Sequence, residues 1–427
     1  MPYGFSEPST AAPTRVPAPA PASRTPHGTA PTPPRLRARA ADALRHAWPA
    51  LAAYTAVRAL GLLVFTVWAH RDHRGVRHLL MESWDCDWYL KIAQNGYADE
   101  LGTRIDGNNL AFFPLYPLLV RAGDALVPWL PRGAAGLSVS VAASLLAAWG
   151  IFAVGDRLYG RRTGVVLAVL WGSLPVALVQ WMGYTESLFT ALCAWSLYAV
   201  LSGRWLWAGS LAALAGLTRP TGVAVAAAVS LTALLAFHRS TSPNPRRPVR
   251  LLRPLRPIRP LRPLRPLLGA FVAPLGWLAY VGWVGLRLGR WDGYFAVQKL
   301  WRNEWDGGVA TWRRMRDLFV TERPALFVAM VTVVLLGAVV LFVLSAGDRQ
   351  PLPLLVFSGL LLVIVLGSSG VYFPRARFLL PGFPLLLPIA VALARARAHV
   401  LVTLLTTAAL MSAVCGGHML LGWHGPP

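Results

Sequence analysis

The sequence carries little charge for its length. Only 14% of its 427 residues are charged, whereas 55% are hydrophobic. Soluble domains usually contain about 25% charged residues, so this composition excludes a chain that faces water over most of its surface. Runs of about 20 apolar residues recur, and each is long enough to cross a hydrocarbon core of roughly 30 Å. We therefore predict an all-α, polytopic integral membrane protein.

Cysteine is also scarce, and two common sequence features are missing. The cysteines Cys86, Cys193 and Cys415 are too few and too scattered for a disulfide framework or a metal cluster. No glycine-rich nucleotide-binding loop occurs, so we predict neither a metal nor a cofactor. Residues 1–34 contain no apolar segment of the kind found in a cleavable signal peptide. They are rich in Pro, Ala and Thr, which predicts a disordered tail.

Acidic residues are outnumbered by Lys and Arg, 18 to 41, which gives a net charge of +23. Binding of nucleic acid would require these basic residues to share one folded face, but they lie between the apolar runs. Arginines that flank membrane spans set the orientation of the spans and contact anionic lipid headgroups. We therefore predict that these basic residues contact membrane lipids and do not bind nucleic acid.

Charge asymmetry orients the chain in the membrane. Four arginines between Arg35 and Arg45 precede the first apolar run, which places residues 1–47 in the cytoplasm as a basic tail. The apolar pattern then predicts about eleven spans of near-bilayer length or shorter. They lie near residues 48–69, 136–154, 163–181, 186–202, 205–238 (two short helices), 268–287, 325–345, 353–369, 377–394 and 400–421.

The division within residues 205–238 rests on one tripeptide. The segment is too long for one span and short for two, and Thr218-Arg219-Pro220 lies near its middle. A charged residue beside a proline is unfavourable at the bilayer centre. We therefore expect two short helices with a break between them, which is tolerable where the break lines a cavity or protein.

A basic, proline-rich linker separates two membrane modules. The N-terminal module covers 48–238 with an outer loop at 70–135, and the C-terminal module covers 267–427 with an outer loop at 288–323. In the linker, 239–266, arginine recurs at every third position from Arg250 to Arg265. Such sequence favours polyproline II, which places the arginines on one ridge. The ridge either contacts a partner or lipid headgroups, or the segment is a stiff cytoplasmic linker.

This topology places four polar clusters at the outer face. The first is Trp84-Asp85-Cys86-Asp87-Trp88-Tyr89, shortly after the first span. Two carboxylates that are two residues apart point to different sides of a helix or strand, so one can face a cleft while the other pairs elsewhere. The alternative is that the cluster is the solvated start of a loop.

The second cluster, Tyr184-Thr185-Glu186, lies at a tight outer turn. An acid at the mouth of an apolar helix is costly unless it is paired. However, a glutamate at a helix N-terminus that is capped by Thr185 also stabilises the helix. From this residue alone we favour the capping role for Glu186.

The third and fourth clusters contain arginines beside prolines: Arg219 at the expected break, and Arg375 and Arg377 within Tyr372 to Phe378. Guanidinium groups match phosphate oxygens through two parallel hydrogen bonds. The three arginines are therefore candidate phosphate ligands, with anchoring to lipid headgroups as the alternative. Acids and arginines from distant segments converge on one face, which suits a reaction that needs a base and a holder for an anionic leaving group.

Five sequence blocks follow one another in a recognisable order. They are Trp84-Asp-x-x-Trp-Tyr-Leu-x-Ile-Ala-x-x-Gly-Tyr97, Ala111-Phe-Phe-Pro-Leu-Tyr-Pro117, and the blocks at 184–189, 218–222 and 377–384. Together they resemble the PIG-V-like mannosyltransferases of the GT-C group of membrane glycosyltransferases, over about residues 50–420. The chain has Trp88 where eukaryotic members often have His, so it resembles a bacterial branch of the family.

The resemblance implies a GT-C-like architecture and a membrane mannosyltransferase. Such an enzyme moves a hexose, mannose in the family, from a polyprenyl-phosphate donor to a glycan, lipid or protein acceptor. For a bacterial member, the site would lie on the outer face of the plasma membrane. A cell-envelope glycolipid or glycoprotein is then a more plausible product than a GPI anchor.

The family's essential acid matches Asp85, ahead of Asp87. As general base, Asp85 would accept the proton of an acceptor hydroxyl during one inverting displacement that requires no metal. Arg377, with Arg219 or Arg375, would hold the phosphate. The other predicted substrate contacts are Asp87, Trp84, Trp88, Tyr89 and Glu186.

Tryptophans at this face have two interpretations. Trp84, Trp88, Trp291, Trp301 and Trp305 either stack on sugars or polyprenyl chains, or form an interfacial aromatic belt.

Two other functional classes fit the same composition. A transporter or lipid flippase also has many spans, broken helices and intramembrane charge. A non-catalytic subunit of a glycosyltransferase complex would keep the fold without needing Asp85. The absence of an internal repeat, and the grouping of the charged motifs at one face, favour the enzyme over a transporter.

Overall fold

The computed structural model describes residues 36–105, 107–241, 264–320 and 325–423, together with Gly4 and Gly425. Within these ranges the chain is helical, and its only β-type pairing is an isolated bridge between Trp305 and Ser368. The predicted all-α fold class is therefore confirmed. Residues 45–427 form one compact unit. Apart from Gly4, the predicted disordered tail before residue 36 lies outside the described residues. So does the Arg/Pro repeat up to residue 263, whereas its last arginine, Arg265, lies in the helix Leu264–Val272.

Within the described residues, six helices are long and apolar enough to cross a membrane by length and composition. They are Ala41–Arg71, Arg132–Tyr159, Gly222–Arg239, Leu264–Arg287, Leu326–Gly347 and Ala398–Gly422. Shorter apolar helices are Glu186–Leu201, Trp205–Gly216, Leu352–Gly367 and Phe383–Arg395. A set of apolar helices of these lengths is typical of an integral membrane protein. The total of eleven spans stays a prediction.

The first helix differs from its predicted bounds. α1 runs over Leu36–Arg71, so residues 36–47, which we expected to belong to the disordered tail, are helical. Pro49 lies inside α1. The segment before it is rich in Ala, Leu and Arg, which are good helix formers, so the helix extends beyond the apolar run.

Several predicted spans are broken helices. As expected from Arg219-Pro220, α8 (Trp205–Gly216) and α9 (Gly222–Thr241) are separate. α10 (Leu264–Val272) and α11 (Leu275–Arg287) are separated beside Pro274. The predicted span 163–181 is divided into α6 (Arg161–Gly172) and η2 (Ala177–Trp181). The predicted span 377–394 is divided into α16 (Arg375–Phe378), η3 (Phe383–Leu386) and α17 (Leu387–Arg395).

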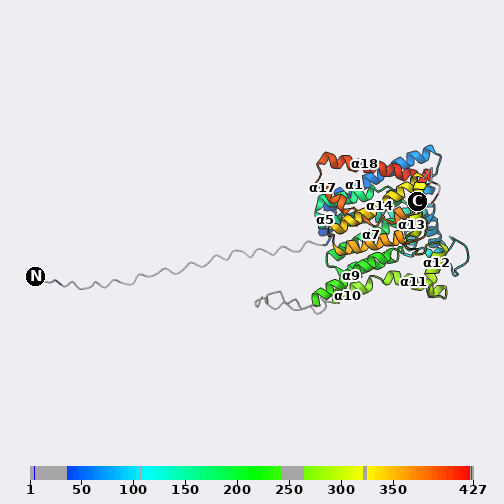
Figure 1. Ribbon diagram of the computed structural model, residues 1–427, viewed down its shortest axis with the longest axis horizontal. Helices are drawn as coiled ribbons and strands as arrows, with labels where there is room; N and C mark the ends of the chain where they lie inside the picture. The colour runs from blue at the N-terminus through cyan, green and yellow to red at the C-terminus, as the bar shows by residue number, and fades with distance from the viewer. Residues whose placement is uncertain are drawn as a thin grey trace. The chain divides into compact units, whose positions relative to one another are not determined.

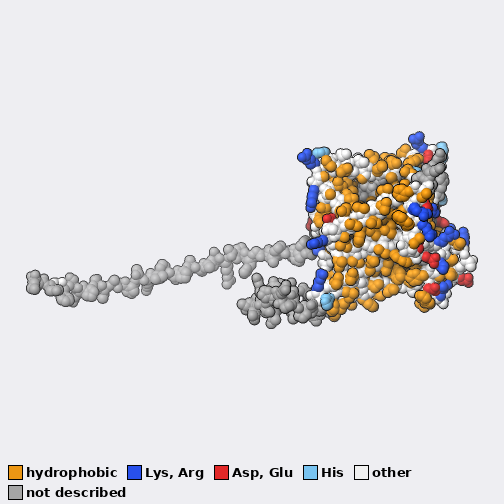
Figure 2. All heavy atoms as spheres, viewed as in Figure 1, with side chains coloured by type: hydrophobic (Ala, Val, Ile, Leu, Met, Phe, Trp, Pro, Cys, Tyr) orange, Lys and Arg blue, Asp and Glu red, His pale blue; other side chains and the backbone are white. Residues whose placement is uncertain are grey.

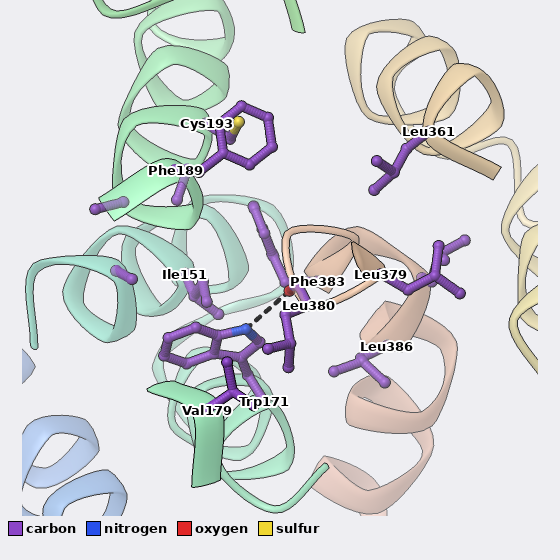
Figure 3. Close-up of a cluster of buried hydrophobic side chains, with 14 of the residues drawn as sticks. Ile151, Trp171, Val179, Phe189, Cys193, Leu361, Leu379, Leu380, Phe383 and Leu386 are labelled. Carbon is purple, nitrogen blue, oxygen red and sulfur yellow. Dashed lines mark hydrogen bonds between the residues drawn. The ribbon is translucent and has the colours of Figure 1, made fainter. Parts of the chain in front are cut away.

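The protein interior supplies partners for these breaks. Trp171 of α6 donates from Nε1 to the carbonyl oxygen of Leu380 at 2.9 Å, between α16 and η3 (Figure 3). In a membrane no water is present to satisfy such a carbonyl, so the donor must come from the protein. Figure 3 shows apolar side chains around this hydrogen bond, including Ile151 of α5 (Arg132–Tyr159), Phe189 and Cys193 of α7 (Glu186–Leu201), and Leu361 of α15 (Leu352–Gly367).

Polar contacts between distant segments define two ends of the helical unit. At one end, His46 Nε2 lies 3.0 Å from Asp156 Oδ2, and Arg162 donates to the carbonyl of Ala396 at 2.7 Å. At the other end, Trp301 donates to the carbonyl of Asn108 at 2.9 Å. Figure 2 shows a broad band of hydrophobic side chains between two ends where charged side chains gather, as expected for a membrane-spanning unit.

The two predicted outer loops contain short helices at the second end. In the first are α2 (Val76–Met81), α3 (Asp85–Asn95), η1 (Asn109–Ala111) and α4 (Leu115–Leu126); in the second are α12 (Gly293–Leu300) and α13 (Val309–Val320) (Figure 1). The loops interlock where Trp301 of the second loop donates to the carbonyl of Asn108 at 2.9 Å. The end of α11 holds the first loop as well, because Tyr280 donates to the carbonyl of Phe112 and Arg287 to the carbonyl of Ala98, both at 2.7 Å. Two distant segments thus enclose one volume.

Candidate functional site

A cavity of about 190 Å³ lies at this second end, between the two interlocked loops. Its lining is Asp85, Tyr89, Ala111, Phe112, Phe113, Thr218, Arg219, Pro220, Gln298, Trp301, Asn303, Val371, Pro374, Arg377 and Phe378. Residues from three of the four predicted clusters are therefore in direct reach of one ligand.

Asp85 is the acidic residue that lines this cavity. It is the first residue of α3, and Trp84 before it has φ +53° and ψ −119°. A non-glycine residue with positive φ is strained, and such strain gathers at functional sites. The Asp85 side chain is 25% exposed, and its Oδ2 accepts from Arg377 Nη2 at 2.6 Å. Arg377 therefore orients the carboxylate through Oδ2, and the partly exposed side chain is accessible from the cavity that it lines.

Behind Asp85 lies a buried group of charges. Arg377 is 4% exposed, and its Nη1 lies 3.6 Å from Oε1 of Glu186, which is 1% exposed. The same Oε1 lies 2.7 Å from Nη1 of Arg219. Two acids and two arginines thus balance each other. Buried charges require such pairing because the loss of water is costly.

The pairing of Glu186 corrects the capping interpretation. Thr185 has helical backbone angles and makes no side-chain cap bond to α7. Its hydroxyl instead accepts from Arg219 Nη1 at 2.9 Å and lies 3.3 Å from the hydroxyl of Tyr89. Glu186 therefore belongs to the ionic group and is not a helix cap whose partner is Thr185.

This ionic group keeps unused hydrogen-bonding capacity. Among the described residues, Nε and Nη1 of Arg377 and both carboxylate oxygens of Glu186 have no hydrogen-bond partner. The contact between Glu186 and Arg219 is therefore a close ion pair without the angle of a hydrogen bond. Donor N–H groups that are buried and unused can be satisfied by an anionic ligand at the cavity.

Two ionisable neighbours of Asp85 on α3 stay protonated. Burial, and secondarily the charge of Asp85, raises the pKa of the Tyr89 hydroxyl above its ordinary value. Burial and the same carboxylate raise the pKa of the Cys86 thiol. Neither group is a base at neutral pH, so Asp85 is the candidate base among the α3 side chains that line the cavity.

Aromatic rings form one wall of the cavity. Trp88 stacks on Phe112 with ring centroids 5.6 Å apart, and Trp301 meets Phe112 edge-on at 5.4 Å. Phe112, Phe113 and Trp301 line the cavity, whereas Trp88 lies behind Phe112 and is not in the lining. The sequence offered one signal for the two phenylalanines, since they belong to the Ala111-Phe-Phe-Pro block, but we did not assign them to the site.

Besides Trp88 and Glu186, three predicted contact residues lie outside the cavity lining. Asp87 forms an exposed ion pair with Lys91 at 2.6 Å, because it lies on the other side of α3 from Asp85. Trp84 packs against the hydrophobic core. Arg375 donates to Thr311 Oγ1 and to the carbonyls of Ser368 and Gly370, which ties the second loop to the end of α15. Neighbouring backbone and hydroxyl oxygens therefore accept from its Nη1 and Nη2, and Arg375 is not in the lining.

Gln298, Asn303 and Val371 line the cavity without having been predicted. Gln298 and Asn303 lie in the second outer loop, away from the five motif blocks, and Val371 directly precedes the fourth cluster. None of the three has a side chain that marked it as a site residue, so the folded structure was needed to assign them. Among the described residues, no group of three or more His, Cys, Asp or Glu is arranged to hold a metal ion.

Comparisons with known proteins agree with this architecture. The family described as dolichyl-phosphate-mannose-protein mannosyltransferase matches residues 114–247, less than half of the chain. No curated protein matches the chain. The crystal structure of ArnT from Cupriavidus metallidurans, bound to undecaprenyl phosphate, has a TM-score of 0.51 and 13% identity, and the match covers 85% of this chain and 63% of ArnT. This chain thus spans less than two thirds of the length of ArnT.

The archaeal oligosaccharyltransferase from Archaeoglobus fulgidus, tethered to an acceptor peptide, has a TM-score of 0.46 and 14% identity, with 90% of this chain and 56% of that chain covered. At these identities a likeness concerns the fold. The match with ArnT confirms the predicted GT-C-like architecture, that of membrane-embedded glycosyltransferases.

Proposed function

We propose that the protein is a membrane glycosyltransferase that moves a hexose from a polyprenyl-phosphate carrier to an acceptor hydroxyl. One observation carries the proposal: the accessible carboxylate of Asp85 lies 2.6 Å from the buried guanidinium of Arg377 in a cavity at one end of the helical unit. A base and an anion holder are thus adjacent. The family match to residues 114–247 and the fold of ArnT, which binds undecaprenyl phosphate, support the same chemistry.

Asp85 acts as general base in this mechanism. Arg377 holds Oδ2, and the acceptor hydroxyl donates its hydrogen bond to Oδ1. The acceptor oxygen forms a bond to the anomeric carbon while the bond from that carbon to the phosphate oxygen breaks. The proton moves to Asp85, and the electron pair leaves with the phosphate. A single displacement inverts the anomeric centre, and base catalysis of this kind contributes about 10²- to 10⁴-fold.

The arginines stabilise the departing phosphate. Arg377 and Arg219 both line the cavity, and the buried Nε and Nη1 of Arg377 make no hydrogen bond with any described residue. Negative charge grows on the leaving oxygen in the transition state, and preorganised donors favour that state over the ground state. The leaving group is a phosphate that is already acidic, so the reaction proceeds without a general acid.

The family resemblance favours mannose as the sugar.

The charge distribution supports an orientation of the cavity in the membrane. The end opposite the cavity carries Arg157, Arg161, Arg162 and Arg395 near its turns. Arginines in such short turns favour the cytoplasmic side. The longer loops at the cavity end also hold arginines, among them Arg71, Arg302 and Arg313, but longer loops obey this rule less strictly. The cavity then opens on the outer face of a bacterial plasma membrane, with the N-terminus inside.

The donor reaction is the direct test. The purified chain in lipid nanodiscs is incubated with polyprenyl-phosphate-[¹⁴C]mannose and membrane extract as the acceptor source. We expect labelled product together with free polyprenyl phosphate. If the sugar stays on its carrier and, in sealed vesicles, the labelled carrier crosses the bilayer faster than in protein-free vesicles, the transporter alternative replaces the enzyme.

A further inference from the structure

A second, outer pocket adjoins the cavity of Asp85. It has a volume of about 420 Å³ and is formed by α12 and the turn that follows it. Gln298 and Asn303 line both the cavity and this outer pocket. A ligand that reaches Asp85 can therefore continue past these two amides toward the solvent.

The outer pocket carries no net charge. Its basic residues are Arg290 and Lys299, and its acids are Asp292 and Glu304. These pair with each other: Arg290 lies 2.6 Å from Asp292, and Lys299 lies 3.6 Å from Glu304. A balanced lining of this kind does not select an anionic headgroup or a phosphate. It is suited to a neutral, polar ligand, in contrast to the buried arginines beside Asp85.

The uncharged polar groups of the outer pocket are two side-chain amides, and hydrogen bonds hold both in position. Gln298 Nε2 donates to the hydroxyl of buried Tyr294 at 2.7 Å, and Asn303 Nδ2 donates to Gln298 Oε1 at 3.2 Å. Each side-chain amide has two donor hydrogens and two acceptor lone pairs, so both retain capacity for a ligand. Groups that both donate and accept match the hydroxyls of a sugar ring.

An exposed aromatic ring completes the outer pocket. Trp305 is 65% exposed, and its ring packs over Gly367, where a Cβ atom would collide with it. Asn303 is placed in the same manner against Gly370. The segment is fixed by backbone bonds from Ser369 N to the Glu304 carbonyl at 2.7 Å and from Asp306 N to the Gly367 carbonyl at 3.0 Å. The ring and the amide are therefore presented in a set geometry.

We propose that the outer pocket binds a second sugar unit of the acceptor, so that the acceptor is a glycan of two or more units. This inference rests on the proposed transferase function. The terminal unit presents its hydroxyl to Asp85, and the preceding unit lies against Trp305 with hydrogen bonds to Gln298 and Asn303. The polar lining and its position at the loop end disfavour a lipid alcohol as the acceptor, because an alkyl chain would find no apolar channel there.

The test compares acceptors that differ by one sugar. Octyl mannoside, octyl dimannoside and a threonine-containing peptide are offered to the full chain in nanodiscs, with polyprenyl-phosphate-mannose as donor. We expect kcat/KM for the dimannoside to exceed that for the monomannoside about tenfold, the effect of one or two good hydrogen bonds and a ring contact. Trp305→Ala abolishes this preference, and Trp305→Tyr keeps most of it.

The matched control is Trp312→Ala, because Trp312 is 67% exposed and lies outside both cavities. We expect it to keep the full preference. Equal use of both mannosides, better use of the peptide, or an unchanged preference in Trp305→Ala overturns the inference. So does transfer into membrane extract without transfer to the dimannoside. These outcomes leave the transferase itself standing, whereas an absence of transfer to every acceptor contradicts both proposals.

Discussion

At the scale of single residues, the buried charges behind Asp85 have the largest consequences. Glu186 is the shared partner of Arg219 and Arg377, and it is 1% exposed. Removing one member of a buried ionic group leaves the others without compensation, which typically costs about 3–5 kcal/mol. Glu186 is thus a positioning residue, since it holds the arginines that would meet the phosphate without lining the cavity itself.

We predict that Glu186→Gln lowers the free energy of unfolding by about 3 kcal/mol and raises KM for the polyprenyl-phosphate donor. Thermal unfolding in detergent and initial-rate kinetics measure the two effects. Glu100→Gln is the control, because Glu100 lies exposed on the first outer loop. An unchanged donor KM in a stable Glu186→Gln protein would show that the arginines are positioned without Glu186.

The sequence predicted the members of this group but not their pairing. Asp85, Glu186, Arg219 and Arg377 were each selected from local motifs, and a topology based on charge placed them at one face. Which acid meets which arginine depends on contacts across as many as 292 positions, as for Arg377 and Asp85. The sequence therefore left Glu186 with a capping role, since its arginine partners are distant in the chain.

At the scale of secondary structure elements, Asp306 caps the helix α13 of the second loop. Asp306 accepts from the backbone N–H groups of Gly308 and Ala310, both at 2.8 Å, at the start of α13. Burial works to raise the pKa of Asp306, but these two hydrogen bonds and the charge of Arg375 outweigh it and hold the pKa below its ordinary value. The ionised form of Asp306 thus stabilises the loop.

We predict that this stabilisation is complete above about pH 4, the ordinary pKa of aspartate, and is lost as pH falls through the lower pKa of the folded state. Hydrogen-exchange protection of residues 308–313 measures it, after correction for the intrinsic exchange rate. Asp306→Asn should reduce the protection at pH 7 and remove the dependence between pH 5 and pH 3. If wild type and variant lose protection in parallel on acidification, Asp306 is not the titrating group.

One close helix crossing depends on a glycine. Gly276 of α11 lies so near the backbone of Ala213 in α8 that an added Cβ would collide with its carbonyl. We predict that Gly276→Ala destabilises the protein by about 1–3 kcal/mol, the usual cost of overpacking. Gly282→Ala in the same helix is the matched control, because nothing lies within 4 Å of its would-be Cβ. Equal melting temperatures for the two variants would refute the tight crossing.

Helix breaks show where sequence patterns stop being informative. The break at Thr218-Arg219-Pro220 was predicted because a charge coincides with a proline. The break near Pro381 and Pro384 was missed because the surrounding residues are uniformly apolar, and an apolar run predicts an unbroken span. The indole of Trp171, on another helix, donates to the carbonyl of Leu380 that this break leaves without a helical partner. That hydrogen bond makes the break tolerable, and only the folded structure shows it.

At the scale of the whole molecule, orientation in the membrane decides which compartment supplies the acceptor. The cavity end contains both interlocked loops, and the opposite end contains the turns near Arg162 and Arg204. Two of the native cysteines give little background in a labelling experiment, because burial raises the pKa of the Cys86 thiol and Cys193 is also buried. Cys415 is half-buried, so its labelling has to be measured in the unsubstituted chain.

We predict that Glu100→Cys reacts with a membrane-impermeant maleimide in intact cells, whereas Arg204→Cys reacts only after the membrane is opened. Both positions are exposed in the structure, so the difference reports the side of the membrane. The unsubstituted chain measures the remaining background. The reverse pattern would place the cavity in the cytoplasm and exclude an extracytoplasmic acceptor.

The most direct test of the catalytic assignment compares sugar transfer by Asp85→Asn and Asp87→Asn, two carboxylates on one helix that the sequence could not separate. Asp85 faces Arg377 in the cavity, and Asp87 pairs with exposed Lys91. At equal expression, we predict that transfer from polyprenyl-phosphate-mannose falls by about 10²- to 10⁴-fold in Asp85→Asn and stays near wild type in Asp87→Asn. Wild-type transfer by Asp85→Asn, or loss of transfer in Asp87→Asn alone, would contradict the assignment of Asp85 as the base.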